Sequence, residues 1–436
     1  MLNEFFKNRK LTRRWWKNLL GIGLAAVMLL AAGGSFVFAQ KKYELSFNTL
    51  FHGGDAQAMV RIVEKFNKEN PQVKIDLVQG QWEDYYAKLY TTVAAGEPPH
   101  IGITHTTYIP SMAPAMTPLE KSRAGNLLDI AGIKGEDYVE DLWKAGVYEG
   151  TRYVVPLDTH MWALWYNKDL FKEAGLDPNN PPNTGKELEE AASKIKAIGK
   201  YVIHPADIGK PRHFRRAWYI LFWQQGGELF DKDFAKATFN NDKGLRALEY
   251  LVNVFQKWGW NKPGTNGNAQ FVAGRLGMLW VGNWFYWTAE RSGVNYATAP
   301  MPQIFDKRVT WGNSHNMVIP KQPLKVSDNV IVTAIKTIKW ISENSDIWGI
   351  YGGHAPAYKP VLEGKKLGES KTWKKSLSVL SDMALEGALH YPIIHPQAKQ
   401  LEHSIQVYVE EAVNGIISPQ EALDKAEEEV NEILGS

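Results

Sequence analysis

Residues 271–287 read FVAGRLGMLWVGNWFYW, a stretch that combines a turn, a short apolar run and an aromatic cluster. Gly274 permits a tight turn, and Leu276–Val281 has the length and apolarity of a buried strand. A Gly-Asn pair ends that run, so Trp284 is expected just beyond the strand's carboxyl end, where ligands of open α/β sheets bind. The flat face of its indole suits the C–H face of a sugar ring, and we expect it to contact a ligand.

The chain that precedes this stretch alternates strands and helices. Strands are expected at Tyr43–Thr49, Val73–Val78 and Ile101–Thr104, with helices at Asp55–Glu69 and Asp84–Ala95 between them. This β-α-β-α-β order predicts a parallel, doubly wound sheet. With 436 residues, of which 44% are hydrophobic and 22% charged, the chain fits two ordinary globular domains.

Further elements follow from hydrophobic periodicity and from end signals. Thr184 is the expected cap of one helix, and Ser418-Pro419-Gln420-Glu421 is a capping box that opens the last one. The expected strands are Tyr153–Pro156 and Ala163–Tyr166, and the expected helices are Asn167–Ala174, Gly185–Ile198, Val330–Ser342 and Ser418–Leu434.

The N-terminus has the order of an export signal. Basic residues between Lys7 and Lys17 precede the uncharged, mostly apolar segment Leu19–Ala39. That order is typical of a secretory signal peptide, so we predict residues 1–39 as a leader that is cleaved after Ala39, and a periplasmic location. The alternative is an uncleaved leader that tethers the protein, since the apolar segment is just long enough to cross a bilayer.

The charge balance depends on this leader. It holds six of the 50 Lys and Arg residues and one of the 47 Asp and Glu residues, so the mature chain has 44 basic and 46 acidic residues. This near-neutral balance gives no reason to expect nucleic-acid binding. The chain has no cysteine, which excludes disulfides, thiolate metal sites and a lipid-modified cysteine.

Several motifs occur in a fixed order through nearly all of the mature chain. They are Phe66–Pro71, Ala94–His100, Leu164–Leu176, Phe271–Trp284, His354–Ala357 and Ser418–Leu423. Together they resemble the family 1 extracellular solute-binding proteins, the maltodextrin-binding type that delivers sugars to ABC importers. One departure is His100, which stands where the family usually has Asp.

The resemblance implies a two-lobed periplasmic-binding-protein fold, in which each lobe is a doubly wound α/β sheet with flanking helices and a cleft lies between the lobes. Three hinge crossings are expected, near Pro156–Leu157, Tyr296–Ala297 and Ser342–Asn344. The N-terminal lobe would comprise 40–156 and 297–343, and the C-terminal lobe 157–296 and 344–436. Sugar binding would favour the closed form by contacting both lobes, and the membrane permease subunits would recognise that form.

The expected ligand is a neutral carbohydrate of more than one ring, bound by a monomer without a cofactor. Aromatic faces pack on its C–H patches, and short polar side chains bind its hydroxyls. The candidate ligand-binding residues are His52, Asp55, Trp82, His105, Thr106, Asp158, His160, Trp284, Trp311, Asn313, His354 and Glu402.

Each aromatic candidate has a structural alternative. Phe285 and Tyr286 are expected in the core, as is at least one of Trp162 and Trp165, because alternate strand residues face opposite ways. Asp55 is equally well explained as a helix cap. The segment 401–404 has no aromatic residue, so a second stacking surface would come from Trp82, Trp223 or Trp287.

Five histidines are expected on loops near the cleft. They are His52, His105, His160, His315 and His354. Converging imidazoles can bind zinc or copper, but no pair has His-x-His or His-x₃-His spacing. The prediction is therefore no metal, with neutral imidazoles that form hydrogen bonds to ligand hydroxyls.

Two other functions remain open from the residues. A secreted glycosidase would need two carboxylates across the sugar ring, and Asp55, Asp158 and Glu402 are the candidates. No nucleophile motif and no phosphate-binding loop is found, so we predict a binding protein and not an enzyme. A polyol, glycerophosphodiester or sugar acid would require a cation such as Arg212, Arg215 or Arg216.

Overall fold

The computed structural model describes residues 42–206, 212–391 and 393–435. The chain divides into residues 1–42 and residues 43–436, and the architecture below is that of the second part. Within the described ranges, no helix combines the length and the apolar character that a bilayer crossing requires. The predicted leader and its cleavage site lie outside the described residues and stay predictions.

The strands form one large sheet, one small sheet and two strand pairs. Their bounds are β1 (Tyr43–Thr49), β2 (Val73–Gln79), β3 (Gly102–His105), β4 (Val147–Tyr148), β5 (Thr151–Arg152), β6 (Val154–Pro156), β7 (Asp158–Asn167), β8 (Tyr201–His204), β9 (Leu276–Gly282), β10 (Tyr296–Ala299), β11 (Thr310–Asn313), β12 (His315–Val318), β13 (Ala355–Pro356) and β14 (Leu389–His390).

The helices surround these sheets. The longer ones are α2 (Gly53–Glu69), α3 (Trp82–Ala94), α8 (Gly185–Ala197), α9 (Arg212–Gln224), α10 (Asp242–Gln256), α13 (Asp328–Glu343), α16 (Ser378–Leu385), α17 (Ala398–Val413) and α18 (Pro419–Gly435). The shorter ones are α4 (Ile109–Met112), α5 (Leu127–Ala131), α6 (Glu140–Lys144), α7 (Lys168–Glu173), α11 (Gly267–Val272), α12 (Tyr286–Ser292), α14 (Lys359–Leu362) and α15 (Lys365–Gly368). The remaining turns are η1 (Thr106–Tyr108), η2 (Ala113–Ala115), η3 (Gly135–Asp137), η4 (Asn283–Phe285), η5 (Trp348–Gly352) and η6 (Trp373–Leu377).

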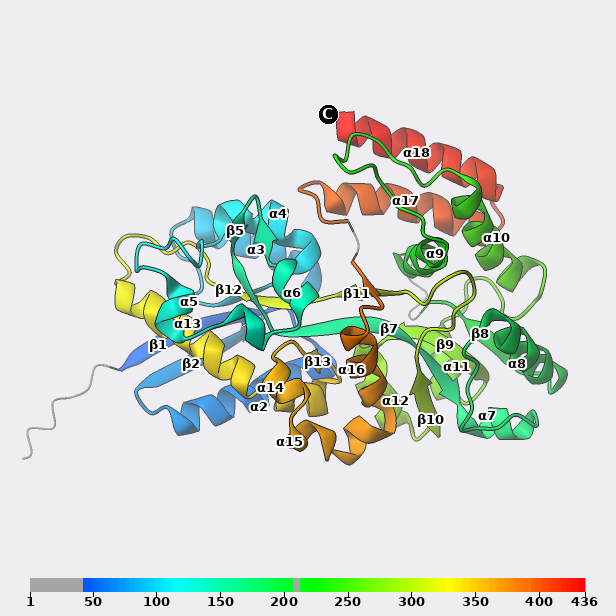
Figure 1. Cartoon of the computed structure of the whole chain (residues 1–436), viewed down its shortest axis with the longest axis horizontal. Helices are drawn as coiled ribbons and strands as arrows, with labels where there is room; N and C mark the ends of the chain where they lie inside the picture. The colour runs from blue at the N-terminus through cyan, green and yellow to red at the C-terminus, as the bar shows by residue number, and fades with distance from the viewer. Residues whose placement is uncertain (1–41, 207–211, 392, 436) are drawn as a thin grey trace, which may run out of the picture. The chain divides into compact units, whose positions relative to one another are not determined.

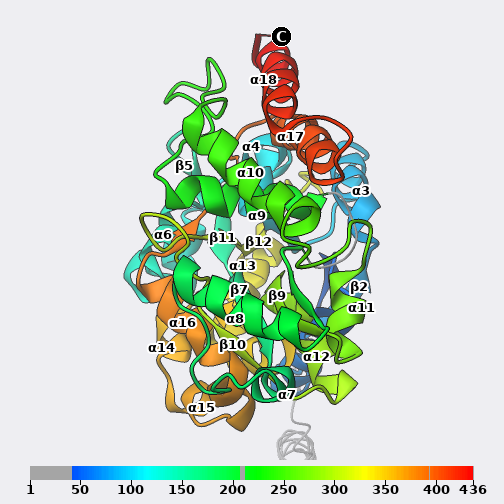
Figure 2. The ribbon, with the colours of Figure 1, turned by 90° about the vertical axis from the view of Figure 1, so that its right-hand side faces the viewer.

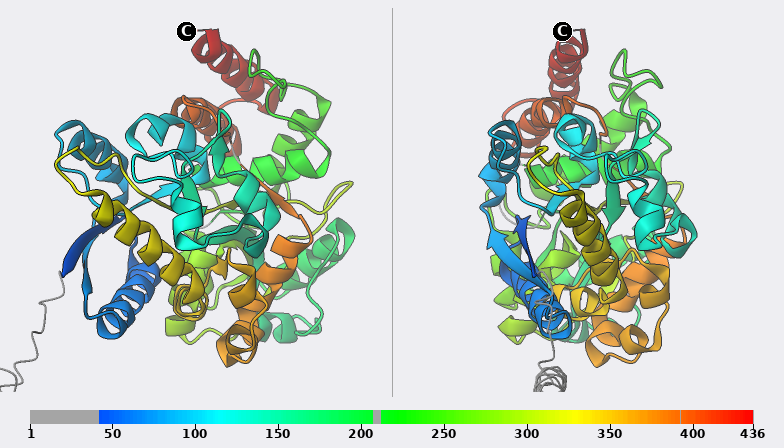
Figure 3. Two further views of the ribbon diagram at one scale, coloured as in Figure 1. Left: turned by 60° about the vertical axis from the view of Figure 1, so that its left-hand side comes forward. Right: turned by 90° about the vertical axis from the view of Figure 1, so that its left-hand side faces the viewer.

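The first strands confirm the predicted parallel order. β1 and β2 pair in parallel along their whole length, and Phe47 of β1 forms a parallel bridge to Ile101. α2 buries Ile62 and Phe66, which lie one turn apart on its apolar face. α13 contacts α2 and β1, so a helix from the second half of the chain covers these strands (Figure 3).

The large sheet is mixed and not parallel. Its order is β14-β11-β7-β9-β8, and β10 and β13 also pair with β7. β7 runs antiparallel to β9, β10, β11 and β13, whereas β8 pairs with β9 in parallel. The predicted strand at Ala163–Tyr166 is only the last part of β7, whose ten residues are all buried. The search for apolar runs missed the first part of β7, because Asp158, Thr159 and His160 are polar.

The C-terminal helices pack on α9 and α10. α17 contacts α9, α10 and α18, and the four helices lie together in two views of the ribbon (Figures 1 and 2). α9 buries Trp218 and Trp223, as expected of an apolar run. The predicted cap at Thr184 is confirmed, and Glu187 completes a capping box there. At the start of α18, the backbone N–H of Glu421 donates to Ser418 Oγ, one half of the predicted capping box.

The chain passes between the small sheet, β3-β12-β6, and the large sheet at two places, Pro156–Asp158 and Asn313–His315. A third passage, Gly352–Ala355, leads from η5, which packs on α2, to β13 on the large sheet. These three connections lie side by side. The N–H of Leu157 donates to the carbonyl of His315 over 2.8 Å, and that of Ala357 donates to the carbonyl of Leu157 over 3.0 Å.

Two predicted crossings lie elsewhere. The crossing expected near Ser342–Asn344 is at Gly352–Ala355, because Ser342 and Glu343 still belong to α13. Tyr296–Ala299 is β10, which pairs with β7, so residues 297–299 belong to the large sheet and not to the small one. The chain changes sheet only after β11, because the antiparallel pairs of β10 and β11 with β7 keep both strands in the large sheet. The lobe boundaries themselves remain a prediction.

Candidate functional site

The carboxylate of Asp158 lies at the first connection and is fully buried. Its Oδ2 accepts hydrogen bonds from His315 Nδ1 at 2.7 Å and from Trp348 Nε1 at 2.6 Å. Its Oδ1 accepts the backbone N–H of His315 at 3.0 Å and His160 Nδ1 at 3.3 Å. Four donors therefore surround one carboxylate, which is how a buried charge is stabilised.

His354, at the third connection, completes what we call the Asp158 cluster: Asp158, His160, His315 and His354. His354 Nδ1 lies 3.5 Å from Asp158 Oδ2, and its Nε2 bonds to Asp55 Oδ1 at 2.9 Å. Asp55 is not the cap of α2, which begins at Gly53 after His52; it lies in the first turn and contacts an imidazole from another part of the chain. Each of the three connections contributes a residue to this cluster.

Electrostatics favour a charged carboxylate within the cluster. Burial alone would raise the pKa of Asp158. The charges of His315 and His354, with the hydrogen bonds from the imidazoles, outweigh burial and hold this pKa well below its usual range. Burial, followed by repulsion from His315, lowers the pKa of His160 to about 3, so this imidazole is neutral.

The pKa of His354 moves the other way. Burial by itself would lower it, but attraction to Asp55 and Asp158 and the hydrogen bond to Asp55 outweigh burial, so this pKa is raised. The ring of His354 is also held by packing, since Trp348 stacks on it with centroids 5.0 Å apart and 19° between the planes.

An aromatic group on the small-sheet side adjoins the cluster. We call Trp82, Tyr86 and Tyr108 the first aromatic group. The three rings lie 6.2–6.3 Å from the ring of His105, and the rings of Tyr86 and Tyr108 are 4.3 Å apart. The Tyr86 hydroxyl accepts the backbone N–H of His105 at 3.0 Å and contacts its Nδ1 at 2.5 Å. Burial is the main cause of a pKa of His105 well below the ordinary value.

A second aromatic group lies on the large-sheet side. It consists of Trp284 and Trp311, whose rings are 6.1 Å apart and nearly perpendicular. Both rings lie near His160, at 5.9 and 6.0 Å. The guanidinium of Arg216 lies 4.0 Å from the ring of Trp311 and 5.5 Å from that of Trp284, which places a cation on both indoles.

Gly282 permits the position of Trp284. A Cβ atom at residue 282 would lie 2.1 Å from the indole ring of Trp284, which folds back over this backbone. Trp284 keeps part of its surface exposed, whereas Phe285 and Tyr286 are buried as predicted. The glycine at the end of β9 therefore positions the indole as well as ending the strand.

Buried polar atoms lie behind the second aromatic group. Three of them have no hydrogen-bond partner among the described residues: Trp311 Nε1, Tyr219 Oη and Trp223 Nε1. Their residues adjoin one another, since Tyr219 contacts Trp223, Trp223 packs on His390, and Trp311 is the neighbour of His390 in the β11–β14 pair. Such donors are costly unless a partner satisfies them.

The side chains of Thr106 and Asn313 are buried and form hydrogen bonds within the protein. Asn313 Oδ1 accepts the N–H groups of Thr106 and Ser314, and its Nδ2 donates to Thr107 Oγ1. Thr106 Oγ1 accepts from Asn316 Nδ2. Both residues are buried, and together they tie β11 and β12 to the turn after β3.

His52 and Glu402 are also not brought to the cluster. His52 is exposed directly before α2 and belongs to none of the contacts described above. Glu402 on α17 forms an ion pair with Arg215 at 2.9 Å, with side chains 15% and 6% exposed. The charge of Glu402 is thus already paired with Arg215. Arg216, which follows Arg215 in the chain, contacts the indoles of Trp284 and Trp311 instead.

Of the proposed second stacking residues, Trp82 lies beside His105, Trp223 is buried against His390, and Trp287 packs against Gly54. Trp162 and Trp165 are both fully buried.

Four residues of the site were not among the predicted ones: Tyr86, Tyr108, Asn283 and Trp348. Of these, only Tyr86 carried a signal, since it follows Trp82 by four residues on one helical face.

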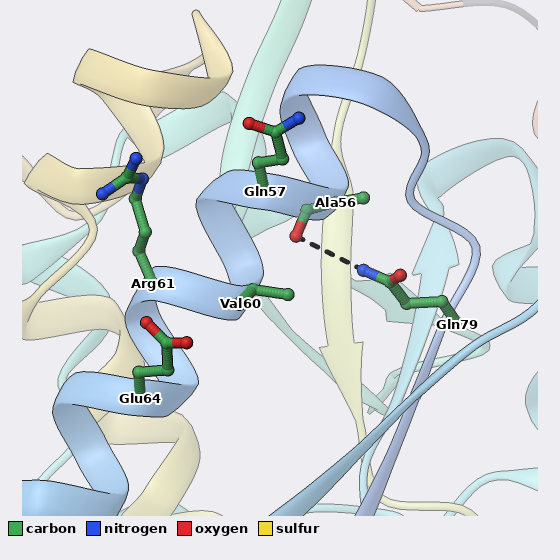
Figure 4. Close-up of a pocket in the computed structure, with 6 residues that line it drawn as sticks. All are labelled: Ala56, Gln57, Val60, Arg61, Glu64 and Gln79. Atoms are coloured by element: carbon green, nitrogen blue, oxygen red, sulfur yellow. Dashed lines mark hydrogen bonds between the residues drawn. The ribbon is translucent and has the colours of Figure 1, made fainter.

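A pocket outlined on the surface lies apart from these residues. It is lined by α2 and by Gln79, whose Nε2 donates to the carbonyl of Ala56 at 3.3 Å (Figure 4). Apart from Ala56, its lining residues are exposed. No aromatic ring and no buried charge lines it, so the Asp158 cluster and the two aromatic groups are the better candidate site.

Sequence relatives include solute-binding proteins. A binding protein of Brucella abortus is 26% identical over 280 residues, which are 62% of this chain and 63% of that protein. The chain thus matches less than two thirds of the length of this relative. The sn-glycerol-3-phosphate-binding periplasmic protein of Escherichia coli is 25% identical over 86% of this chain and 88% of its own.

Solved structures share the fold. An ABC transporter solute-binding protein from Thermotoga lettingae, bound with α-D-tagatose, has a TM-score of 0.75 at 22% identity and covers 90% of this chain and 100% of its own. A cyclic α-maltosyl-1,6-maltose binding protein from Arthrobacter globiformis has a TM-score of 0.74 at 24% identity, with 90% and 99% covered. The fold is therefore the two-lobed periplasmic-binding-protein fold, as predicted.

The family model for bacterial extracellular solute-binding proteins matches residues 52–322. This range is more than half of the chain and includes Asp55, the first aromatic group, Asp158 and His315. The chain belongs to the bacterial extracellular solute-binding protein family.

Proposed function

We propose that this protein is the solute-binding component of an ABC importer and that it captures a carbohydrate between the two aromatic groups. The single observation that carries the proposal is the second aromatic group, where the buried donors of Trp311, Tyr219 and Trp223 find no hydrogen-bond partner in the part of the chain that the structure describes. Indole faces pack on the C–H patches of a sugar, and its hydroxyls satisfy the donors.

The two sides of the site suit a hinge mechanism. The first aromatic group belongs to elements of the small-sheet side, and the second follows or belongs to strands of the large sheet. A sugar that contacts both groups stabilises the form in which they lie close together, because only differential affinity shifts such an equilibrium. The permease would recognise this form, in keeping with the family. A periplasmic location and a monomeric state remain part of the proposal.

Catalysis is less well supported than binding. A glycosidase requires one carboxyl group with a raised pKa and a second one that reaches the sugar. Asp158 is fully buried, accepts four hydrogen bonds and has a lowered pKa, and Glu402 is paired with Arg215. Incubation with oligosaccharides separates the two functions: intact ligand agrees with binding, and shortened products would show an enzyme.

A second candidate ligand carries a negative charge. Arg216 places a guanidinium on both indoles of the second aromatic group, and such a cation pairs with a carboxylate or a phosphate. The likeness to a glycerol-3-phosphate-binding protein agrees with this candidate. A sugar acid or glycerophosphodiester would thus replace the neutral sugar, with the same aromatic contacts.

The test is a thermal-shift screen against neutral mono- and oligosaccharides, sugar acids and glycerol 3-phosphate. A ligand at about 100 times its Kd adds about 2.7 kcal/mol to the unfolding free energy. Trp284→Ala is expected to abolish the shift and leave the protein folded. Trp340→Ala is the matched control. Trp340 is also a partly buried tryptophan, but it lies on α13 and packs on Phe66 of α2, away from the two aromatic groups. An unchanged shift in Trp284→Ala would remove the indole from the site.

A further inference from the structure

We propose that Asp158, His160, His315 and His354 bind one divalent transition-metal ion of the zinc type. One ligand atom from each of these residues lies within 4.8 Å of the others, and all four side chains are buried. Imidazole and carboxylate groups in this number are the ligands of a tetrahedral zinc site. The inference does not depend on the proposed ligand, because the metal site needs no carbohydrate.

The distances fit a tetrahedral ion with a small adjustment. Zinc–ligand bonds of about 2.0–2.2 Å place neighbouring ligand atoms about 3.3–3.6 Å apart. From the Asp158 oxygens, His160 Nδ1 is at 3.3 Å and His354 Nδ1 at 3.5 Å. His315 Nδ1 is at 2.7 Å, so this imidazole has to move by about 0.6 Å to reach the same spacing. Binding through the Nδ1 atoms of His160 and His315 also requires the tautomers with the proton on Nε2, so the ion replaces their hydrogen bonds to Asp158.

The amide of Asn283 determines which nitrogen of His354 carries the proton. Asn283 Oδ1 accepts the N–H of Met161 at 2.8 Å, and its Nδ2 donates to the carbonyl of Gly353 at 2.7 Å. This orientation turns an N–H group toward His354 Nδ1, 3.1 Å away. His354 Nδ1 is therefore an acceptor, and the proton of the ring is on Nε2.

Two acceptors then face one another in a buried place. His354 Nδ1 and Asp158 Oδ2 are 3.5 Å apart, and neither carries a proton. The single lone pair of Nδ1 accepts from Asn283 Nδ2, so an ion bound at Nδ1 replaces this hydrogen bond. This arrangement is unfavourable without a positive charge between the two atoms. A divalent cation bound by both atoms removes the conflict and neutralises the buried carboxylate.

The surroundings of the cluster are those of a metal site. His354 donates its other ring N–H to the carboxylate of Asp55, the carboxylate–histidine pairing that orients metal ligands in proteins. Trp348 Nε1 orients the Asp158 carboxylate, and Phe51 packs its ring edge-on against His315 at 5.0 Å. The ligands are thus positioned by a second layer of contacts.

The first test measures metal uptake by the mature protein after EDTA treatment and dialysis, in the absence of carbohydrate. We expect one zinc ion per chain by elemental analysis, a raised melting temperature in zinc, and the visible absorption of tetrahedral Co²⁺ on cobalt addition. No zinc uptake, or a cobalt spectrum of six-coordinate ions, would overturn the proposal.

The second test uses variants. His354→Gln and His160→Gln are each expected to lower zinc affinity at least tenfold in a calorimetric titration. His403→Gln is the matched control, because His403 is an exposed histidine on α17. Equal affinities in the cluster variants and the control would show that zinc binds elsewhere on the surface, which contradicts the proposal.

A third variant guards against misfolding. Asp55 is partly exposed, so Asp55→Asn is expected to fold, and far-UV circular dichroism in EDTA checks this. Loss of the Asp55 carboxylate weakens the orientation of His354 and should lower zinc affinity tenfold or more. An unchanged affinity would overturn the role of His354. Thermal shifts with carbohydrate are measured in the same samples. They test carbohydrate binding separately from zinc binding, since either proposal can fail while the other holds.

Discussion

The Asp158 cluster and the two aromatic groups adjoin one another but are built in opposite ways. In the cluster, one fully buried carboxylate accepts four hydrogen bonds from three residues. In the aromatic groups, Trp82, Tyr86 and Trp284 keep part of their surface exposed, whereas Trp311 is buried, and all of them are held mainly by ring contacts. The cluster therefore links the three connections, whereas the aromatic groups are the surfaces that we propose contact the ligand.

The largest effect is expected from the cluster itself. Asp158→Asn removes the charge and turns an amide N–H toward donors, which should lower the free energy of unfolding by about 3–5 kcal/mol. Urea denaturation measures this loss. Asp141→Asn is the control, since Asp141 is exposed on α6 and should change stability by less than about 0.5 kcal/mol. A loss for Asp158→Asn as small as that of the control would mean that the carboxylate does not hold the connections together.

The next effect concerns a histidine behind the second aromatic group. Burial, followed by repulsion from Lys307, lowers the pKa of His390 to about 4, and its ring packs on Trp223 with centroids 4.3 Å apart. The unfolded chain binds this proton at its ordinary pKa of about 6.5. The neutral ring thus contributes stability above pH 6.5 that is lost as the pH falls toward 4.

His390→Gln should remove that slope. The difference in unfolding free energy between the natural protein and this variant is expected to shrink by on the order of 3 kcal/mol between pH 7 and pH 4. Denaturation curves at several pH values measure it, and His403→Gln is the exposed control. A constant difference across this range would show that His390 titrates normally in the folded protein.

The third prediction displaces one indole without changing it. Gly282→Ala places a methyl group 2.1 Å from the ring of Trp284, so we expect a loss of about 1–3 kcal/mol in stability and a shift in tryptophan fluorescence. Gly368→Ala is the control, because a Cβ there meets nothing within 4 Å. Unchanged fluorescence in Gly282→Ala would mean that the indole does not rest on this backbone.

The smallest effect tests the contact between the first aromatic group and His105. Tyr86→Phe removes the hydroxyl that accepts the N–H of His105, with an expected loss of about 1 kcal/mol. Tyr90→Phe on the same helix is the control, since Tyr90 is 48% exposed. Equal stability of the two variants would show that the hydroxyl does not hold His105.

Much of the fold could be predicted from local rules. The strand-and-turn pattern at Leu276–Val281 correctly placed β9 and the turn that precedes Trp284, and the predicted cap at Thr184 marked the start of α8. These features depend on neighbours in sequence, so a single chain displays them. The start of β7 was missed, because Asp158 and His160 are polar and break the apolar pattern. This part of the strand is buried because β11 and β13 pair with β7.

The candidate site was predicted in parts. Trp284, Trp311 and the histidines were chosen because they follow strands, and most of them do lie together. The absence of His-x-His and His-x₃-His spacing argued against a metal site, yet three connections that are distant in sequence bring Asp158, His160, His315 and His354 together. The cluster forms only when the three connections come together in the folded chain. The spacing of residues along the sequence does not show this contact.

The three connections have a mechanical consequence. Any rotation of one sheet against the other about these segments moves a residue in proportion to its distance from them. Asp158, His315 and His354 lie at the connections and so move least, whichever way the sheets tilt. An ion bound by these residues would hold the three connections together and still allow the sheets to rotate. Trp82, Trp284 and Trp311 lie farther from the connections, so their fluorescence would change with the angle between the sheets.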